Sequence, residues 1–195
     1  MKKLGIISMI AVAAFTFQSC SNETKDSKEV ADSLNEAKDT TSNSTTTGGI
    51  AVNEDDASFA TKAAMGGMAE VEFSKVAVQK ATNVELKSFA DMMVSDHGKV
   101  NEDLKTLAGV KNITLPGMLD DEHQKMLTDL SAKSGSDFDK KYASMMVDDH
   151  QKTYDLLDKQ AKDGTDSDLK AFAAKTAPIV KGHLDKIKSI KDKLK

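Results

Sequence analysis

The residues best suited to chemistry are histidines in a short sequence motif that occurs twice. MMVSDH at 92–97 returns 53 residues later as MMVDDH at 145–150, and the wider segments 89–108 and 142–161 are identical at nine of twenty positions. Imidazole exchanges protons near neutral pH and is the commonest metal ligand among side chains. The repeat is compatible with a duplicated helical hairpin, and equally with two halves of one site.

All four histidines of the chain fall on apolar stripes with helical spacing. Along each stripe, apolar residues recur every three or four positions, as they do on a helix face that packs against neighbouring helices. The four are His97, four residues after Met93; His150, four after Met146; His123, four after Leu119; and His183, three after Val180. A single histidine on such a face is usually a hydrogen-bonded core residue. That all four histidines lie on apolar stripes indicates more than four separate core residues.

Four long helices are predicted to carry these stripes, over residues 55–82, 83–110, 137–162 and 167–194, with a short helix over about 120–133. Prolines occur only at 116 and 178, and runs of β-branched residues are absent. We therefore expect an all-α protein, an antiparallel four-helix bundle with a short extra helix in the connection between the second and third long helices. The long helices are expected to run alternately up and down.

Three of the histidines and one glutamate fall at the middle of this predicted bundle. His97, His150 and His183 lie near the middles of their helices, and a mid-helix residue sits at mid-bundle whichever way its helix points. The middle of the first long helix holds Glu70 and Glu72, which point about 200° apart around the helix axis. We expect Glu70 to point inward, because it shares a seam with the phenylalanines of its helix. The result is one polar layer inside an apolar bundle.

A buried layer of one carboxylate and three imidazoles needs partners, because unpartnered buried polar groups are costly. The predicted metal ligands are Glu70, His97, His150 and His183, which suit Zn, Fe, Cu or Mn. Weaker candidates are His123, Glu72, Met93 and Met146, with the two thioethers suited to Cu(I). Asp96 and Asp149 point about 100° away from their neighbouring histidines and are expected to be solvated or to support them from outside. The alternative is a Glu–His hydrogen-bond network that fixes helix register without any metal.

The N-terminus predicts export and lipidation. Met1-Lys2-Lys3 precedes an apolar run of about 14 residues, which is typical of a signal peptide and too short to span a bilayer. Residues 1–19 are the predicted lipoprotein signal peptide, and cleavage before Cys20, the single cysteine, would leave a lipidated N-terminus. Residues 20–54 are predicted to be a disordered tether with at most a transient helix, which leaves 55–195 as one domain. The expected location is the cell envelope, lipid-anchored and facing the periplasm, with the outer membrane as the expected membrane.

The composition argues against nucleic-acid binding and against several kinds of enzyme. The formal net charge is −4, all 27 basic residues are lysines, and there is no tryptophan. Arginine is the usual residue for phosphates and base edges, so an acidic chain without arginine is not expected to bind nucleic acid. The sequence also has no nucleophile in a recognisable setting and no glycine-rich phosphate loop. We assign no catalytic residue, and protein partners cannot be named.

Several stretches resemble a known family. They are AEVEFSK at 69–75, ELKSFADMMVSDH at 85–97, FDKKYASMMVDDH at 138–150 and LKAFAAKTAP at 169–178. Together they resemble a bacterial exported family of unknown function in the ferritin-like superfamily, domain of unknown function 4142, over roughly residues 54–190. The resemblance implies a ferritin-like four-helix bundle in the envelope, and it implies no activity.

One departure from di-iron members of that superfamily concerns the ligands. Those proteins carry Glu-x-x-His on two helices, but here valine stands three residues before each of His97, His150 and His183. A carboxylate-bridged di-iron centre would therefore lack most of its ligands, and the sequence does not support ferroxidase or oxygenase chemistry.

Overall fold

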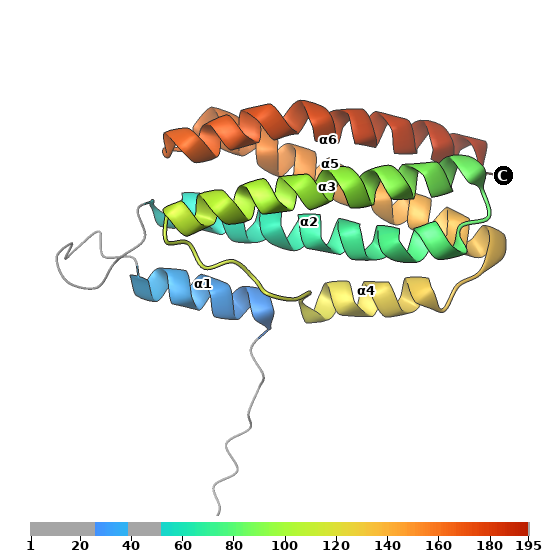
Figure 1. The fold of residues 1–195 in the computed structure, drawn as a ribbon, viewed down its shortest axis with the longest axis horizontal. Helices are drawn as coiled ribbons and strands as arrows, with labels where there is room; N and C mark the ends of the chain where they lie inside the picture. The colour runs from blue at the N-terminus through green and yellow to red at the C-terminus, as the bar shows by residue number, and fades with distance from the viewer. Residues whose placement is uncertain (1–25, 39–51, 195) are drawn as a thin grey trace, which may run out of the picture.

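The structure is a computed structural model that describes residues 26–38 and 52–194. Within these residues it contains six helices and no strands (Figure 1). The helices are α1 (Ser27–Lys38), α2 (Glu54–Lys80), α3 (Val84–Val110), α4 (Asp121–Ser131), α5 (Gly135–Asp163) and α6 (Ser167–Lys193). The predicted all-α bundle, with a short helix between its second and third long helices, is confirmed.

The directions of the long helices differ from the alternating order expected from the sequence. In Figure 1, α2 and α6 run one way along the bundle, and α3 and α5 run the other way. The contacts at the helix ends agree, because Asp56 at the start of α2 accepts a hydrogen bond from Gln160 near the end of α5, at 2.6 Å. The linker that follows α3, together with helix α4, carries the chain back along the bundle before α5 begins. Such a single long crossover also occurs in ferritin-like bundles.

Each long helix packs against two antiparallel neighbours. The contacting pairs are α2–α3, α3–α6, α6–α5 and α5–α2, so α3 and α5 face each other across the bundle diagonal. A half-turn about the bundle axis therefore exchanges α3 with α5, and the two copies of the repeated motif occupy equivalent positions. A duplication that turned the α2–α3 hairpin into α5–α6 would instead have paired α3 with α6. The repeated motif therefore marks two equivalent positions in the bundle and does not reflect duplication of the α2–α3 hairpin.

Side-chain caps define where four of the helices begin. Asn53, Asn83, Asp120 and Asp166 each stand just before a helix and accept a backbone N–H of its first turn. Asp139 of α5 adds a second type of anchor, since its carboxylate accepts the backbone N–H groups of Thr82 and Asn83 at the α2–α3 turn, at 3.0 and 2.9 Å. These contacts fix the start of α3 against α5.

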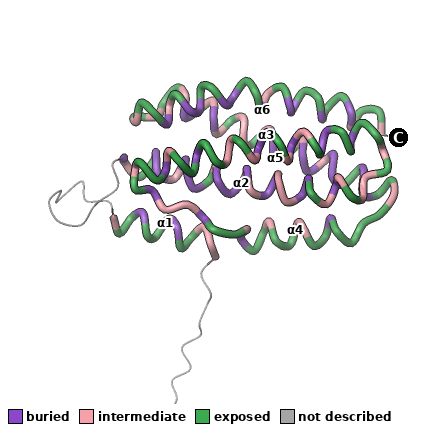
Figure 2. The backbone as a smooth tube through the Cα atoms, in the orientation of Figure 1, coloured by how far each residue is buried: buried purple, intermediate pink, exposed green. Residues whose placement is uncertain are grey.

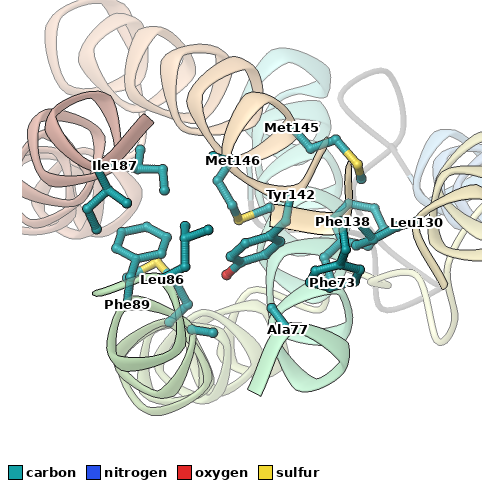
Figure 3. Close-up of a cluster of buried hydrophobic side chains, with 14 of the residues drawn as sticks. Phe73, Ala77, Leu86, Phe89, Leu130, Phe138, Tyr142, Met145, Met146 and Ile187 are labelled. Carbon is teal, nitrogen blue, oxygen red and sulfur yellow. The ribbon is translucent and has the colours of Figure 1, made fainter. Parts of the chain in front are cut away.

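The bundle interior consists of two apolar clusters with a polar layer between them. Figure 2 shows buried residues on the inward faces of the long helices. Figure 3 shows the first cluster, which surrounds Phe73, Phe89 and Tyr142. The second cluster lies toward the other end and includes Phe59 and Leu157. On α3, α5 and α6 the histidine of the polar layer falls between the two clusters, and on α2 Glu70 lies at the edge of the first cluster.

Helix α1 corrects the expected tether over residues 26–38. It packs against the outside of α2, and its Asn35 side chain bonds both backbone groups of Thr114, at 2.7 Å to the N–H and 2.9 Å to the carbonyl. Thr61 of α2 also donates to Asp32, at 2.6 Å. The helix is held mainly through polar side chains, and apolar periodicity does not report such docking.

The predicted signal peptide, Cys20 and residues 39–51 lie outside the described residues. Within 26–38 and 52–194, no helix combines the length and apolar character needed to cross a membrane.

Candidate metal centre

Histidines from three helices meet in the polar layer. His97 of α3, His150 of α5 and His183 of α6 have ring centroids 5.1 to 5.7 Å apart. One potential ligand atom from each ring lies within 4.8 Å of those of the other two. The three side chains are buried, with exposed fractions of 2%, 0% and 6%. The convergence predicted from mid-helix positions is therefore present in the fold.

One nitrogen of each ring faces an acceptor on the outside of the group. His97 Nδ1 lies 2.7 Å from Glu70 Oε2, and His183 Nε2 lies 3.3 Å from Asp96 Oδ2. His150 Nδ1 lies 2.9 Å from the carbonyl oxygen of Met146, one turn earlier in its helix. Because only an N–H can satisfy these acceptors, the arrangement places the protons on these outer nitrogens. In the neutral form of each ring, the lone pairs of His97 Nε2, His150 Nε2 and His183 Nδ1 are left for the inside.

The inner nitrogens are short of hydrogen-bond donors. His97 Nε2 and His183 Nδ1 lie 3.2 Å apart, so their two lone pairs would repel each other unless a proton or a cation lay between them. His150 Nε2 is buried and has no hydrogen-bond partner within the described part of the chain. A buried nitrogen without a partner is uncommon in a folded protein and calls for an explanation.

Glu70 and His97 carry opposite charges in the metal-free centre. Burial alone would raise the pKa of Glu70, but the charges of His97 and His150 outweigh it and lower that pKa to about 2. Burial alone would lower the pKa of His97, and the adjacent Glu70 carboxylate outweighs it, so that the pKa is raised. Of the three rings, His97 is therefore the one that favours the protonated form, and the Glu70 carboxylate balances that charge.

The other two rings favour the neutral form, which is the form that binds metals. Burial lowers the pKa of His150. Burial, together with the charges of His97 and His150, lowers the pKa of His183 to about 4. Both rings therefore favour the neutral state that a metal ligand needs at neutral pH.

Glu70 points inward as predicted, and Glu72 does not. The Glu70 side chain is fully buried and contacts two of the rings, with Oε1 3.3 Å from His150 Nδ1. Glu72 is partly exposed and pairs with Lys75 on the surface of α2, at 2.7 Å. Glu70 reaches His97 and His150 through their outer nitrogens, so it lies beside the group of three imidazoles.

The remaining candidates from the sequence lie apart from the three rings. Met93 and Met146 are fully buried in the first apolar cluster, and Figure 3 shows Met146 beside Tyr142. His123 of α4 binds Asp120 at 2.6 Å through Nδ1 and stacks on Phe73. Among the described residues, His123 is not in the group of side chains that could hold an ion.

The two aspartates next to the repeated histidines differ from each other. Asp96 is partly exposed and contacts His183, in line with the predicted supporting role. Asp149 is 9% exposed, and its Oδ2 has no hydrogen-bond partner among the described residues. Burial and the Glu70 charge raise its pKa to about 6. Its position about 60° around the helix from the buried Met146 was the signal available in the sequence.

The fold and the centre define a helical-bundle protein with a buried cluster of imidazoles supported by carboxylates. A family model described as "Domain of unknown function (DUF4142)" matches residues 40–190. The chain belongs to this family. Its membership in the ferritin-like superfamily stays a prediction.

Comparison with other proteins adds evidence for the fold. A solved structure, a DUF305 fragment from Deinococcus radiodurans, is similar, with a TM-score of 0.62 and 11% sequence identity. The match covers 72% of this chain and 97% of that one. At this identity the likeness concerns the fold. No curated protein matches the chain.

Proposed function

We propose that this protein binds one divalent transition-metal ion inside its bundle, through His97 Nε2, His150 Nε2 and His183 Nδ1. The observation that carries the proposal is the buried, unpartnered His150 Nε2, whose ring lies in one group with those of His97 and His183. A cation at the centre of the group would satisfy all three nitrogens. A network that served only helix register would have no use for a nitrogen without a partner.

The spacing of the nitrogens supports this ligand set. Zn–N bonds of about 2.0–2.1 Å in a tetrahedral site place the nitrogens about 3.3 Å apart. His97 Nε2 and His183 Nδ1 already have this separation, at 3.2 Å. One nitrogen of each ring lies within 4.8 Å of those of the other two, so small side-chain shifts would bring three nitrogens to this spacing. Three imidazoles leave a fourth position open for water or another ligand.

In this proposal the carboxylates hold the ligands in place. Glu70 would fix His97 through Nδ1 and offset the charge of the ion, and Asp96 would fix His183 in the same way. Such outer partners set the tautomer and orientation of metal-binding imidazoles. Imidazole suits Zn, Cu and Fe, and both methionines are buried in the first apolar cluster.

We expect metal to stabilise the protein and His150→Gln to abolish most of that gain. A metal present at about 100 times its Kd adds about 2.7 kcal/mol to the free energy of unfolding. For a domain of this size, that raises the Tm by roughly 5–10 °C. The measurements are thermal unfolding with Zn²⁺, Co²⁺, Cu²⁺ and Mn²⁺, and elemental analysis of untagged protein.

His123→Gln is the matched control, because it removes an imidazole outside the group. It should keep the full stabilisation by metal. Wild-type protein that contains no metal and shows no Tm shift with any of the four ions would end the proposal in favour of the register-fixing network.

We further propose that the bundle is anchored to the cell envelope through Cys20 and faces the periplasm. The support is the basic start, the apolar run and the cysteine that follows it. Wild-type chain expressed with an alkyne fatty acid should be labelled and recovered in membranes, while Cys20→Ser should be unlabelled. Labelling of Cys20→Ser, or wild-type protein that is unlabelled and soluble, would contradict the anchor.

A further inference from the structure

A pocket of about 390 Å³ opens on the side of the bundle between α2, α4 and α5. Its rim carries exposed charged residues, among them Lys62, Glu122 and Lys152, while Met65 and Asp149 in its lining are buried. The pocket therefore extends from solvent to the packed surface of the bundle. Neither the apolar core nor the fold requires it.

Asp149 in the lining of this pocket is an acceptor without a donor. Its Oδ2 is one of three buried side-chain atoms that have no hydrogen-bond partner in residues 26–38 and 52–194. The other two are Glu70 Oε2 and His150 Nε2, both in the candidate metal centre. Glu70 Oε2 still lies 2.7 Å from His97 Nδ1. Asp149 Oδ2 and His150 Nε2 belong to adjacent residues, and a cation would satisfy either of them.

One side chain contacts both the pocket and the centre. Thr153 lines the pocket, and its Oγ1 donates a hydrogen bond to Glu70 Oε1, at 3.4 Å. Gly66, one turn before Glu70 in α2, also lines the pocket, and a Cβ atom there would lie 3.5 Å from Thr153 Oγ1. Because Gly66 has no side chain, few atoms separate the pocket from Glu70 at this point.

We propose that this pocket is the port through which a divalent transition-metal ion reaches the three-histidine centre, with Asp149 as the carboxylate that first takes the ion from water. The ion binds Asp149 Oδ2 as part of its hydration shell is lost, passes Thr153 and Glu70, and ends on the imidazoles. A carboxylate on the way compensates the cost of removing water from the ion. This port rests on the proposed function, since it has no purpose without a metal centre.

The competing route is the seam between α3 and α6. Asp96 is 36% exposed there and lies 3.3 Å from His183 Nε2, which makes His183 the ring nearest the surface on that side. The pocket offers a buried carboxylate oxygen that no protein group occupies, so the structure favours the pocket.

The test is the rate of Co²⁺ uptake, followed by stopped-flow absorbance as cobalt enters the imidazole site. We expect Asp149→Asn to slow association by about tenfold or more, since a charge that steers and binds the incoming ion is removed. Gly66→Leu, which fills the pocket without changing charge, should slow association and dissociation by the same factor. The Kd of Gly66→Leu should therefore stay within about twofold of wild type.

Two controls separate the port from general effects of charge. Asp148→Asn removes an exposed carboxylate next to Asp149 that does not line the pocket, and it should change the association rate by less than about twofold. Asp96→Asn tests the seam. Circular dichroism and the Tm of each variant establish that it folds, and leucine at Gly66 favours the helix.

Each outcome decides between the proposals. Slower uptake in Asp149→Asn and Gly66→Leu, with normal uptake in Asp148→Asn, supports the port. Uptake at the wild-type rate in Gly66→Leu, or a large loss of rate confined to Asp96→Asn, overturns the port and leaves the metal centre intact. A wild-type chain that takes up no Co²⁺ at equilibrium overturns both.

Discussion

Replacing Glu70 by alanine is expected to lower the free energy of unfolding of the metal-free protein by about 3–5 kcal/mol. The Glu70 side chain is fully buried and ionised, and His97 is the protonated ring that it balances. Alanine at this position would leave a buried imidazolium without its counter-charge and would open a cavity in the layer. Both effects act against the folded state, so this is the most destabilising single substitution we expect in the centre.

The measurement is urea unfolding at pH 7 in the presence of a chelator. Glu72→Ala is the matched control on the same helix, because Glu72 is partly exposed and pairs with Lys75 on the surface. Its effect should stay within about 0.5 kcal/mol. Equal effects of Glu70→Ala and Glu72→Ala would show that the Glu70–His97 pair does not contribute as argued.

The same pair sets the direction of a pH effect on folding. The pKa of Glu70 is lowered from 4.5 to about 2, so the unfolded chain binds a proton in this window that the folded chain does not. Stability from Glu70 is therefore fully present above pH 4.5 and is lost as the pH falls through about 2. Glu70→Gln should lose this part of the acid sensitivity, which acid titrations of both chains would reveal.

Most of the fold was predictable because helix boundaries and inward faces are local properties. Apolar steps of three and four residues marked the seams, and capping residues such as Asn83 and Asp120 marked where helices begin. The direction of α5 was not predictable in this way, since an apolar stripe looks the same whichever way its helix runs. The sequence allowed only a transient helix at α1, because its docking depends on Asn35, which binds the backbone of Thr114, far away in the chain.

The candidate centre was predictable at the level of residues and not of atoms. Mid-helix position and the inward seam selected Glu70 over Glu72, and they placed three histidines in one layer. Which nitrogen of each ring faces inward depends on acceptors from other helices, such as Glu70 for His97 and Asp96 for His183. For the same reason Glu70 looked like a ligand in the sequence, whereas in the fold it lies behind His97.

The affinity of the centre for metal is expected to fall about 100-fold between pH 7 and pH 5, which corresponds to one displaced proton. His97, whose pKa is raised by Glu70 against the effect of burial, holds a proton that metal binding must release. His150 and His183 have lowered pKa values, near 4 for His183, because both rings are buried, so both favour the neutral form that binds metal. Three histidines with the ordinary pKa of 6.5 would instead lose affinity on the order of 10⁴-fold.

Competition with a chelator of known pH dependence measures this slope, and calorimetry in buffers of different ionisation enthalpy counts the protons released at pH 6. The control His123→Gln should give the same slope as wild type, because that imidazole lies outside the group. A slope near three would mean that the fold does not keep His150 and His183 neutral. A slope near zero would mean that His97 carries no proton, and the lone pairs of His97 and His183 would then face each other at 3.2 Å with nothing between them. The Glu70–His97 pair requires the release of one proton. In the metal-free bundle the Glu70 carboxylate holds that proton on His97, and after metal binding the same carboxylate balances the charge of the metal ion.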